Sequence, residues 1–174
     1  MITMSRALLL LGCVSGLMWP KKVTDPGAPP RPKFPVTDSL HLDDEQREAS
    51  MQIERGLRVH GFSDELIKGA IVNAYAESGL DRNAVGRAGE RGVFQLNPVG
   101  LGRKMSDEQM HDISISTHRI AAAIKKNRRL MKVEQAGSSV ETLTAVFCEE
   151  IERPKNKKTK ARQRAKLVKK ISRS

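Results

Sequence analysis

Aromatic residues are scarce in this chain: one Trp, one Tyr and four Phe make up 3% of its 174 residues. With so few rings, a core must be built mainly from Leu, Ile, Val, Ala and Met, which suits a small helical domain better than a sheet protein. The two cysteines, Cys13 and Cys148, exclude a disulfide framework. Cys148 falls in a predicted helix and is most simply a small buried hydrophobic residue.

Metal-ligand spacing is also missing. The four histidines show no regular spacing, and no cysteine lies near any of them: His41, His60, His111 and His118. Zinc sites bring together closely spaced Cys and His ligands. The sequence therefore predicts no metal site, and it carries no motif that indicates another cofactor.

No apolar run is long enough for a confident membrane span, which needs about 20 apolar residues. The nearest approach follows Arg6 and covers residues 7–19, which have the length of the apolar region of a signal peptide. Leu10-Leu11-Gly12-Cys13 resembles a bacterial lipobox, so Cys13 is a candidate lipidation site. Residues 1–19 are open to three interpretations: a cleaved or lipidated signal, an uncleaved membrane anchor, or an ordinary buried helix.

Residues 20–37 form a predicted linker. Their prolines are closely spaced: Pro20, Pro26, Pro29, Pro30, Pro32 and Pro35. Such a stretch is extended and semi-rigid and has no packed core of its own. It would hold the following domain away from a surface.

Net charge is absent from most of the chain and concentrated at its C-terminal end. Residues 153–174 hold 11 of the 31 basic residues and no acidic residue, whereas residues 1–152 hold 20 of each sign. The sequence therefore predicts a neutral body and a basic tail, 155–174, that is helical at most locally. The tail would set where the protein binds, with an anionic polymer, an anionic lipid or a nucleic acid as its partner.

A helical domain is predicted between residues 38 and 154. Apolar spacing and capping residues indicate helices over 43–60, 63–78, from about 107, 115–133 and 139–152. Between Gly79 and Gly102 there are six glycines, which indicate a loop with Val93–Leu96 as its one strand candidate. The expected fold is mainly α with a small loop or β segment after the second helix.

Glu77 is the first residue that suggests chemistry. Leu66, Ala70, Ala74 and Glu77 follow one another at spacings of 4, 4 and 3, so they share one helix face. Burial at the edge of a core, together with the negative end of the helix dipole, favours the protonated form of a carboxyl group, as a general acid requires. A Glu that reaches out to water at a fraying helix end is the alternative.

The residues around Glu77 resemble a known family. Glu77-Ser78-Gly79 resembles the catalytic motif of soluble lytic transglycosylases and goose-type lysozymes, and Gly92-Val93-Phe94-Gln95 resembles a second motif that the family carries about fifteen residues later. Phage-encoded structural lysozymes pair these motifs with a late phenylalanine and a Glu-Arg-Pro sequence, here Phe147 and Glu152-Arg153-Pro154. The resemblance covers about residues 60–155 and implies a lysozyme-like α+β fold.

The resemblance implies that Glu77 protonates the glycosidic oxygen between N-acetylmuramic acid and N-acetylglucosamine in peptidoglycan glycan strands. In a lytic transglycosylase the same residue then acts as base on the muramoyl 6-hydroxyl group, which gives a 1,6-anhydro product. Ordinary glycosidases use two carboxylates. The nearest further acids, Asp81 and Glu90, have no compelling position, and we expect loop roles for both. The family's later Tyr-Asn motif is absent, so hydrolysis stays an alternative outcome.

Four further residues are substrate-binding candidates by the same resemblance: Tyr75, Ser78, Gln95 and Asn97. Structural roles are open as well. Ser78 would be a hydrogen-bonding residue at a helix C-terminus, and Gln95 a strand residue. Tyr75 faces either the cleft or the core.

Two other classes of function compete with the enzyme. A nucleic-acid-binding protein would explain the basic tail, although that tail has no aromatic residue for base stacking. A structural virion or envelope protein would keep the packing residues of a lysozyme fold and dispense with catalysis. As an enzyme, the protein would act in a virion or at the bacterial envelope, where its N-terminus would contact a membrane or other virion proteins.

Overall fold

The structure of the chain is a computed structural model that describes residues 41–171. The segment 1–19 with Cys13 and the linker 20–37 therefore lie outside the described residues. Among the helices that are described, none is both long enough and apolar enough to cross a membrane.

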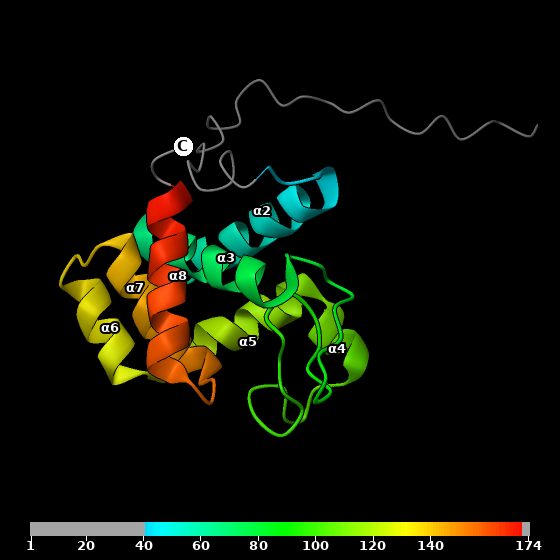
Figure 1. Cartoon of the computed structure of the whole chain (residues 1–174). Coiled ribbons are helices and arrows are strands. Elements are labelled where there is room, and N and C mark those ends of the chain that lie inside the picture. The colour runs from blue at the N-terminus through cyan, green and yellow to red at the C-terminus, as the bar shows by residue number, and fades with distance from the viewer. Residues whose placement is uncertain (1–40, 172–174) are drawn as a thin grey trace, which may run out of the picture. The chain divides into compact units, whose positions relative to one another are not determined.

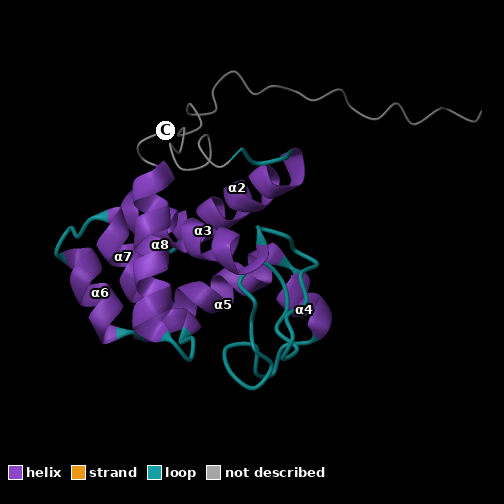
Figure 2. Cartoon of the chain, in the orientation of Figure 1, coloured by secondary structure: helices purple, strands orange, loops and turns teal. Residues whose placement is uncertain are grey.

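The described residues fold into a mainly helical domain, as the sequence predicts (Figures 1 and 2). In chain order its helices are α2 (Asp44–Arg58), α3 (Asp64–Ser78), α4 (Asp107–His111), α5 (Ile113–Lys126), α6 (Arg128–Gln135), α7 (Val140–Phe147), the π-helix η1 (Cys148–Glu152) and α8 (Lys157–Ile171).

Helix α3 lies at the centre of this arrangement, because α2, α7 and α8 all pack against it. Its buried residues surround most of the helix: Leu66, Ile67, Gly69, Ala70, Ile71, Val72, Asn73 and Ala74. A helix that is apolar on most sides is stable only where other helices cover it. The last turn of α3, from Tyr75 to Ser78, leaves this covered region and is only partly buried.

Both ends of α3 are fixed by residues that the sequence marks as helix caps. The side chain of Ser63 accepts a hydrogen bond from the backbone N–H of Leu66. Gly79 ends the helix in the left-handed conformation with φ of 67°, and its N–H donates to the Tyr75 carbonyl oxygen. These caps place Glu77 and Ser78 in the last turn.

The predicted helix 115–133 is wrong in its extent, because the chain breaks at Asn127. This residue ends α5, and its side chain accepts a hydrogen bond from the Leu130 N–H to begin α6. The apolar pattern continues across the break and so predicts one helix. The Asn127 side chain, however, competes with backbone carbonyl groups for the N–H groups that follow it, and this favours a new helix start. The predicted helix 139–152 likewise consists of α7 followed by η1.

The π-helix η1 ends on the Glu152-Arg153-Pro154 segment. Arg153 has the left-handed φ of 50°, and its N–H donates to the Cys148 carbonyl oxygen, five residues earlier. Single π-turns of this kind are frequent at functional sites. The π-helix ends at Glu152, and Pro154 lies just beyond its end, as the sequence predicts.

The segment between α3 and α4 is a loop rather than a strand. The predicted strand Val93–Leu96 is wrong: residues 92–95 form a turn between two isolated bridges, Val85 to Arg91 and Arg91 to Leu96. Gln95 adopts a φ of 46°, which a strand residue does not. The apolar side chains of this segment, Val93, Phe94 and Leu96, are nevertheless buried in the core.

The basic C-terminal segment differs from the sequence expectation, because most of it is the fifteen-residue helix α8. Helix α8 packs against α7, α3 and η1. Its buried residues Ala161, Arg164 and Val168 are spaced 3 and 4 apart and so share one face. Val168 packs with Val72 of α3. The charge composition of the segment does not reveal this buried face, because the lysines occupy the other sides of the helix.

Candidate active site

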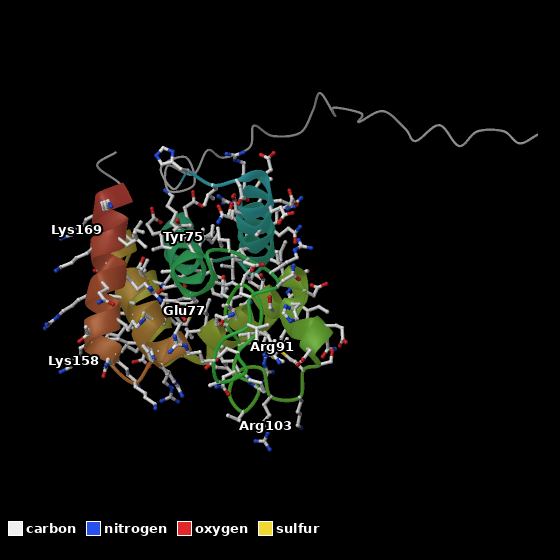
Figure 3. The ribbon with its side chains drawn as sticks, turned by 45° about the vertical axis from the view of Figure 1, so that its right-hand side comes forward. Tyr75, Glu77, Arg91, Arg103, Lys158 and Lys169 are labelled. Atoms are coloured by element: carbon white, nitrogen blue, oxygen red, sulfur yellow. The ribbon has the colours of Figure 1, made fainter. Side chains whose placement is uncertain are left out.

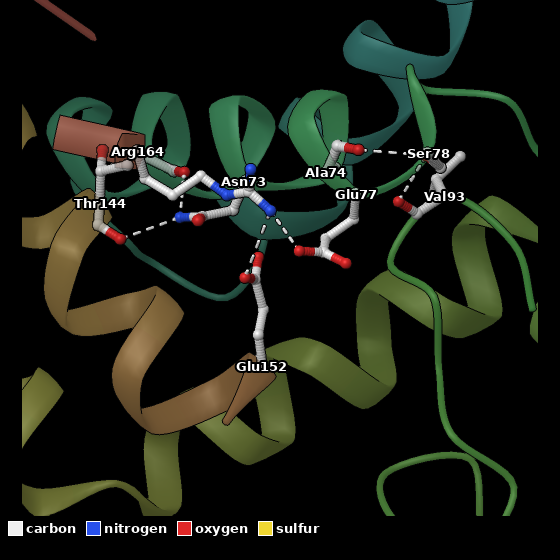
Figure 4. A network of polar contacts seen from close by, with 9 residues as sticks. Asn73, Ala74, Glu77, Ser78, Val93, Thr144, Glu152 and Arg164 are labelled. Carbon is white, nitrogen blue, oxygen red and sulfur yellow. Dashed lines mark hydrogen bonds and ion pairs between the residues drawn. The ribbon is translucent and has the colours of Figure 1, made fainter. Parts of the chain in front are cut away.

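Glu77 lies in the last turn of α3, with 27% of its side chain exposed. Its Oε1 accepts a hydrogen bond from Nη2 of Arg164, which comes from α8 (Figure 4). The carboxylate is therefore held by a charged partner at the edge of the core. It does not extend freely into water, which was the alternative interpretation.

Glu152 approaches the same guanidinium group from η1. Its Oε2 is 3.9 Å from Arg164 Nη2, and only 11% of its side chain is exposed. Burial and the neighbouring Glu77 carboxylate together raise the pKa of Glu152 to about 7, although Arg164 acts to lower it. Glu152 is thus a second carboxyl group beside Glu77.

Arg164 links the two carboxyl groups. The residue is 7% exposed, and its Nε makes no hydrogen bond. Sequence reasoning missed Arg164 and assigned no role to Glu152. Two features of the sequence could have indicated these residues. The family resemblance already includes Glu152, and Arg164 is a charged residue between Ala161 and Val168 on an otherwise apolar stripe.

Ser78 joins the end of α3 to the turn that carries Gln95. Its Oγ donates to the Ala74 carbonyl oxygen at 3.1 Å and to the Val93 carbonyl oxygen at 2.8 Å. Both contacts are within the protein, so the structural interpretation of Ser78 accounts for its hydroxyl group. Its effect on the site is to fix the two motifs against each other.

Gln95 and Asn97 line a pocket of about 420 Å³. Gln95 Nε2 donates to the carbonyl oxygens of Ala84 and Gly92, so one end of its side chain holds the loop. Asn97 Oδ1 accepts from the backbone N–H of Val99. The pocket brings these two predicted residues together.

The same pocket is bounded on the other side by the end of α7 and by η1. Phe147, Glu150 and Glu152 contribute to its wall. Glu77 is not among the lining residues, so the pocket and the Glu77 carboxylate meet at Glu152. The phenylalanine and the Glu-Arg-Pro sequence of the family resemblance therefore lie at the site, together with the glutamine motif.

Three other candidates lie away from the carboxyl groups. Tyr75 is partly buried and packs against the core, which is one of its two predicted orientations. Asp81 Oδ1 accepts from the Asn83 N–H, and Glu90 Oε2 accepts from the Ala88 N–H. Both acids stabilise turns of the loop, as expected for them.

Asn73 fastens α3 to α7 behind the site. It is fully buried, and its Nδ2 donates to the carbonyl oxygens of Gly69 and Thr144 (Figure 4). Buried polar contacts of this kind fix how two helices lie against each other. The position of Glu77, one helical turn further along α3, is set by the same packing.

A buried central helix with a carboxylate in its last turn beside a pocket is consistent with the class of lysozyme-like glycosidases. Comparison with protein families matches residues 48–172 to the phage tail lysozyme family, and the chain belongs to that family. A peptidoglycan-degrading, lysozyme-like function follows from the membership. Neither the curated proteins nor the solved structures provide a match. The matched range includes Glu77, Glu152 and Arg164.

Proposed function

We propose that the protein cleaves the β-1,4 bond between N-acetylmuramic acid and N-acetylglucosamine, with Glu77 as its acid and base. The observation that carries this proposal is the position of Glu77, at the end of a buried helix and next to the wall of the pocket. A carboxyl group in this setting can donate a proton to a glycosidic oxygen and later accept one.

The pocket suits a sugar with an acetamido group. Its volume of about 420 Å³ falls within the range of about 300–1,000 Å³ usual for small-molecule sites. The wall combines apolar side chains with the amide side chains of Gln95, Asn97 and Asn127. We propose that Gln95 and Asn97 contact the glycan, whereas Ser78 and Tyr75 support the site from within the fold.

We propose that the reaction is a lytic transglycosylation. Glycosidases with two catalytic carboxylates place them on either side of the sugar ring. Here one nitrogen atom of the Arg164 guanidinium group contacts both Glu77 and Glu152, so the two carboxyl groups face the same cation (Figure 4). Glu152 is therefore unsuited to attack from the opposite face, and the substrate's own 6-hydroxyl group is the better nucleophile.

Mass analysis of the sugar products tests activity and reaction type together. Purified peptidoglycan digested with the protein should yield 1,6-anhydro-muramoyl ends. Hydrated reducing ends alone would replace transglycosylation by hydrolysis. No cleavage under any condition would favour a structural protein on an inactive lysozyme fold.

We propose that the protein is a virion component that opens the cell wall during infection, because its family is that of phage tail lysozymes. Detection of the chain in purified virions by mass spectrometry tests this role. Its presence only in lysates of infected cells would instead indicate a role in host lysis.

The outer face of α8 is a candidate binding surface for anionic polymers of the envelope. The exposed basic residues of α8 are Lys157, Lys158, Lys160, Arg162, Lys166, Lys169 and Lys170. Lys158 and Lys169 point away from the domain (Figure 3). We propose that this face holds the enzyme near its substrate, through contacts that salt weakens.

A further inference from the structure

Three charged side chains from three helical segments meet at one point of the domain (Figure 4). Glu77 comes from α3, Glu152 from η1 and Arg164 from α8. One nitrogen atom, Nη2 of Arg164, contacts both carboxyl groups. Glu152 and Arg164 are almost fully covered by the protein, with 11% and 8% of their side chains exposed.

One guanidinium group cannot neutralise two carboxylates. If both were ionised, the cluster would carry an uncompensated negative charge in a poorly solvated place, which is costly. Two carboxyl groups that share a site therefore retain one proton to a higher pH than either would alone. With one proton bound and Arg164 charged, the cluster is neutral.

In the resting enzyme, Glu152 retains that proton more readily than Glu77. Arg164 donates its charge-assisted hydrogen bond to Glu77 and not to Glu152. Glu152 lies further from Arg164, at 3.9 Å, and its buried Oε2 makes no hydrogen bond. Burial, which raises the pKa of Glu152 to about 7, acts in the same direction.

The surroundings of Glu152 provide little competing charge. The thiol of Cys148, in the same π-helix, is neutral, since burial raises its pKa to about 12. Across the pocket, Lys126 of α5 is exposed to solvent. Glu150 points to another partner, Arg129, at 2.9 Å. The charge state of Glu152 is therefore governed by its burial and by the charges of Glu77 and Arg164.

We propose that Glu152 is the proton reserve of Glu77, and that Arg164 positions both carboxyl groups so that they share one proton. This inference rests on the proposed function of Glu77. When substrate binds, the proton passes from Glu152 to the Glu77 carboxylate, and Glu77 delivers it to the leaving glycosidic oxygen. Glu77 then takes a proton from the muramoyl 6-hydroxyl group as the new bond forms. The pair thus regains its single proton at the end of each turnover.

The pH dependence of kcat/KM distinguishes this role from a structural one. Glu152→Gln removes the second carboxyl group and leaves Glu77 beside Arg164 alone. The alkaline limb of the profile should then move to lower pH by about one to three units. Arg164→Gln removes the compensating positive charge and should move the same limb to higher pH. Glu152→Asp keeps a carboxyl group and should keep the limb near its original position, at a lower rate.

Glu149→Gln is the matched control. Glu149 lies on the same π-helix but pairs with Arg129 at 2.7 Å and does not line the pocket. Its substitution should leave the alkaline limb in place. If Glu152→Gln and Glu149→Gln both leave the limb unchanged, or if Glu152→Gln and Arg164→Gln lower the rate without opposite shifts, the proton-reserve role is wrong.

Carbon-13 NMR of the wild-type side-chain carboxyl groups gives a test that does not depend on a variant that folds. The carboxyl carbon of Glu152 should titrate near neutral pH. Titration of Glu152 below about pH 5, as in an unperturbed glutamate, would overturn the inference. Failure of the proposed function is distinguishable, because it would show as no cleavage by the wild-type protein at any pH. If wild-type protein cleaves and Glu77→Gln does not, an unshifted Glu152→Gln profile overturns the proton reserve alone.

Discussion

Arg164 of α8 forms an ion pair with Glu77 of α3, 87 residues earlier in the chain. The contact makes the basic C-terminal helix part of the site. Deletion of this helix is therefore unsuitable as a test of binding alone, because it would also remove the partner of Glu77. Single substitutions on its two faces separate packing from binding.

Val168→Ala tests whether α8 is a packed element. Val168 is 1% exposed and packs against Val72 of α3. Loss of two buried carbon atoms, and the cavity left behind, should lower the free energy of unfolding by about 2 kcal/mol. Urea denaturation measures this value. Lys169→Ala, at the neighbouring exposed position, should change it by less than about 0.5 kcal/mol. Equal effects of the two substitutions would contradict the packing of α8.

Reversal of charge on the outer face of α8 tests the binding surface. The double variant Lys158→Glu, Lys169→Glu should bind purified cell walls more weakly than wild-type protein at low salt. The difference should vanish at high salt, because screening weakens contacts between exposed charges. Turnover of small soluble muropeptides should be unchanged. Wall binding equal to that of wild-type protein at low salt would exclude this face as the binding surface.

Ser78→Ala tests the connection between α3 and the glutamine turn. The substitution leaves the buried Val93 carbonyl oxygen without its hydrogen-bond donor, which costs about 1–3 kcal/mol. Thermal unfolding should report the lower stability, and activity should fall with it because the turn that carries Gln95 is less firmly held. Ser114→Ala, at an exposed position of α5, is the control and should change neither quantity. A Ser78→Ala protein of unchanged stability but low activity would indicate direct contact with substrate instead.

The stability of the protein should decrease as pH rises from about 4.5 to about 7. The pKa of Glu152 is raised in the folded state, to about 7, so the folded protein binds more protons than the unfolded chain across this interval. Stability then falls with rising pH, by up to about 1.4 kcal/mol per pH unit for one such group. The melting temperatures of wild-type protein and Glu152→Gln should therefore differ less at acid pH than at neutral pH. A constant difference across the interval would contradict the shift.

Sequence reasoning reached the helical fold and the place of Glu77 in the last turn of a helix, because both depend on local patterns. The spacing of Leu66, Ala70 and Ala74 fixes one face of α3, and Ser63 and Gly79 mark its ends. Sequence reasoning failed where one local pattern is compatible with two structures, a continuous helix or two capped helices. The apolar pattern crosses Asn127 without interruption, yet this residue caps α6 instead of continuing α5.

The second carboxyl group and its partner were beyond sequence reasoning for a different reason. Glu152 reaches Glu77 only because a π-turn follows α7, and no local pattern predicts that turn. Arg164 lies in a segment where basic residues are frequent, so its burial depends on the face that α8 turns toward α3. Both are tertiary relationships, and only the packed structure reveals them.

The most direct measurement of the central claim is the turnover of purified peptidoglycan by Glu77→Gln. The amide keeps the size and shape of the side chain and removes the group that donates the proton. The account predicts that turnover falls by about a hundredfold or more, while circular dichroism and thermal unfolding show a folded domain. A folded Glu77→Gln protein that cleaves peptidoglycan at a rate near that of wild-type protein would contradict the account.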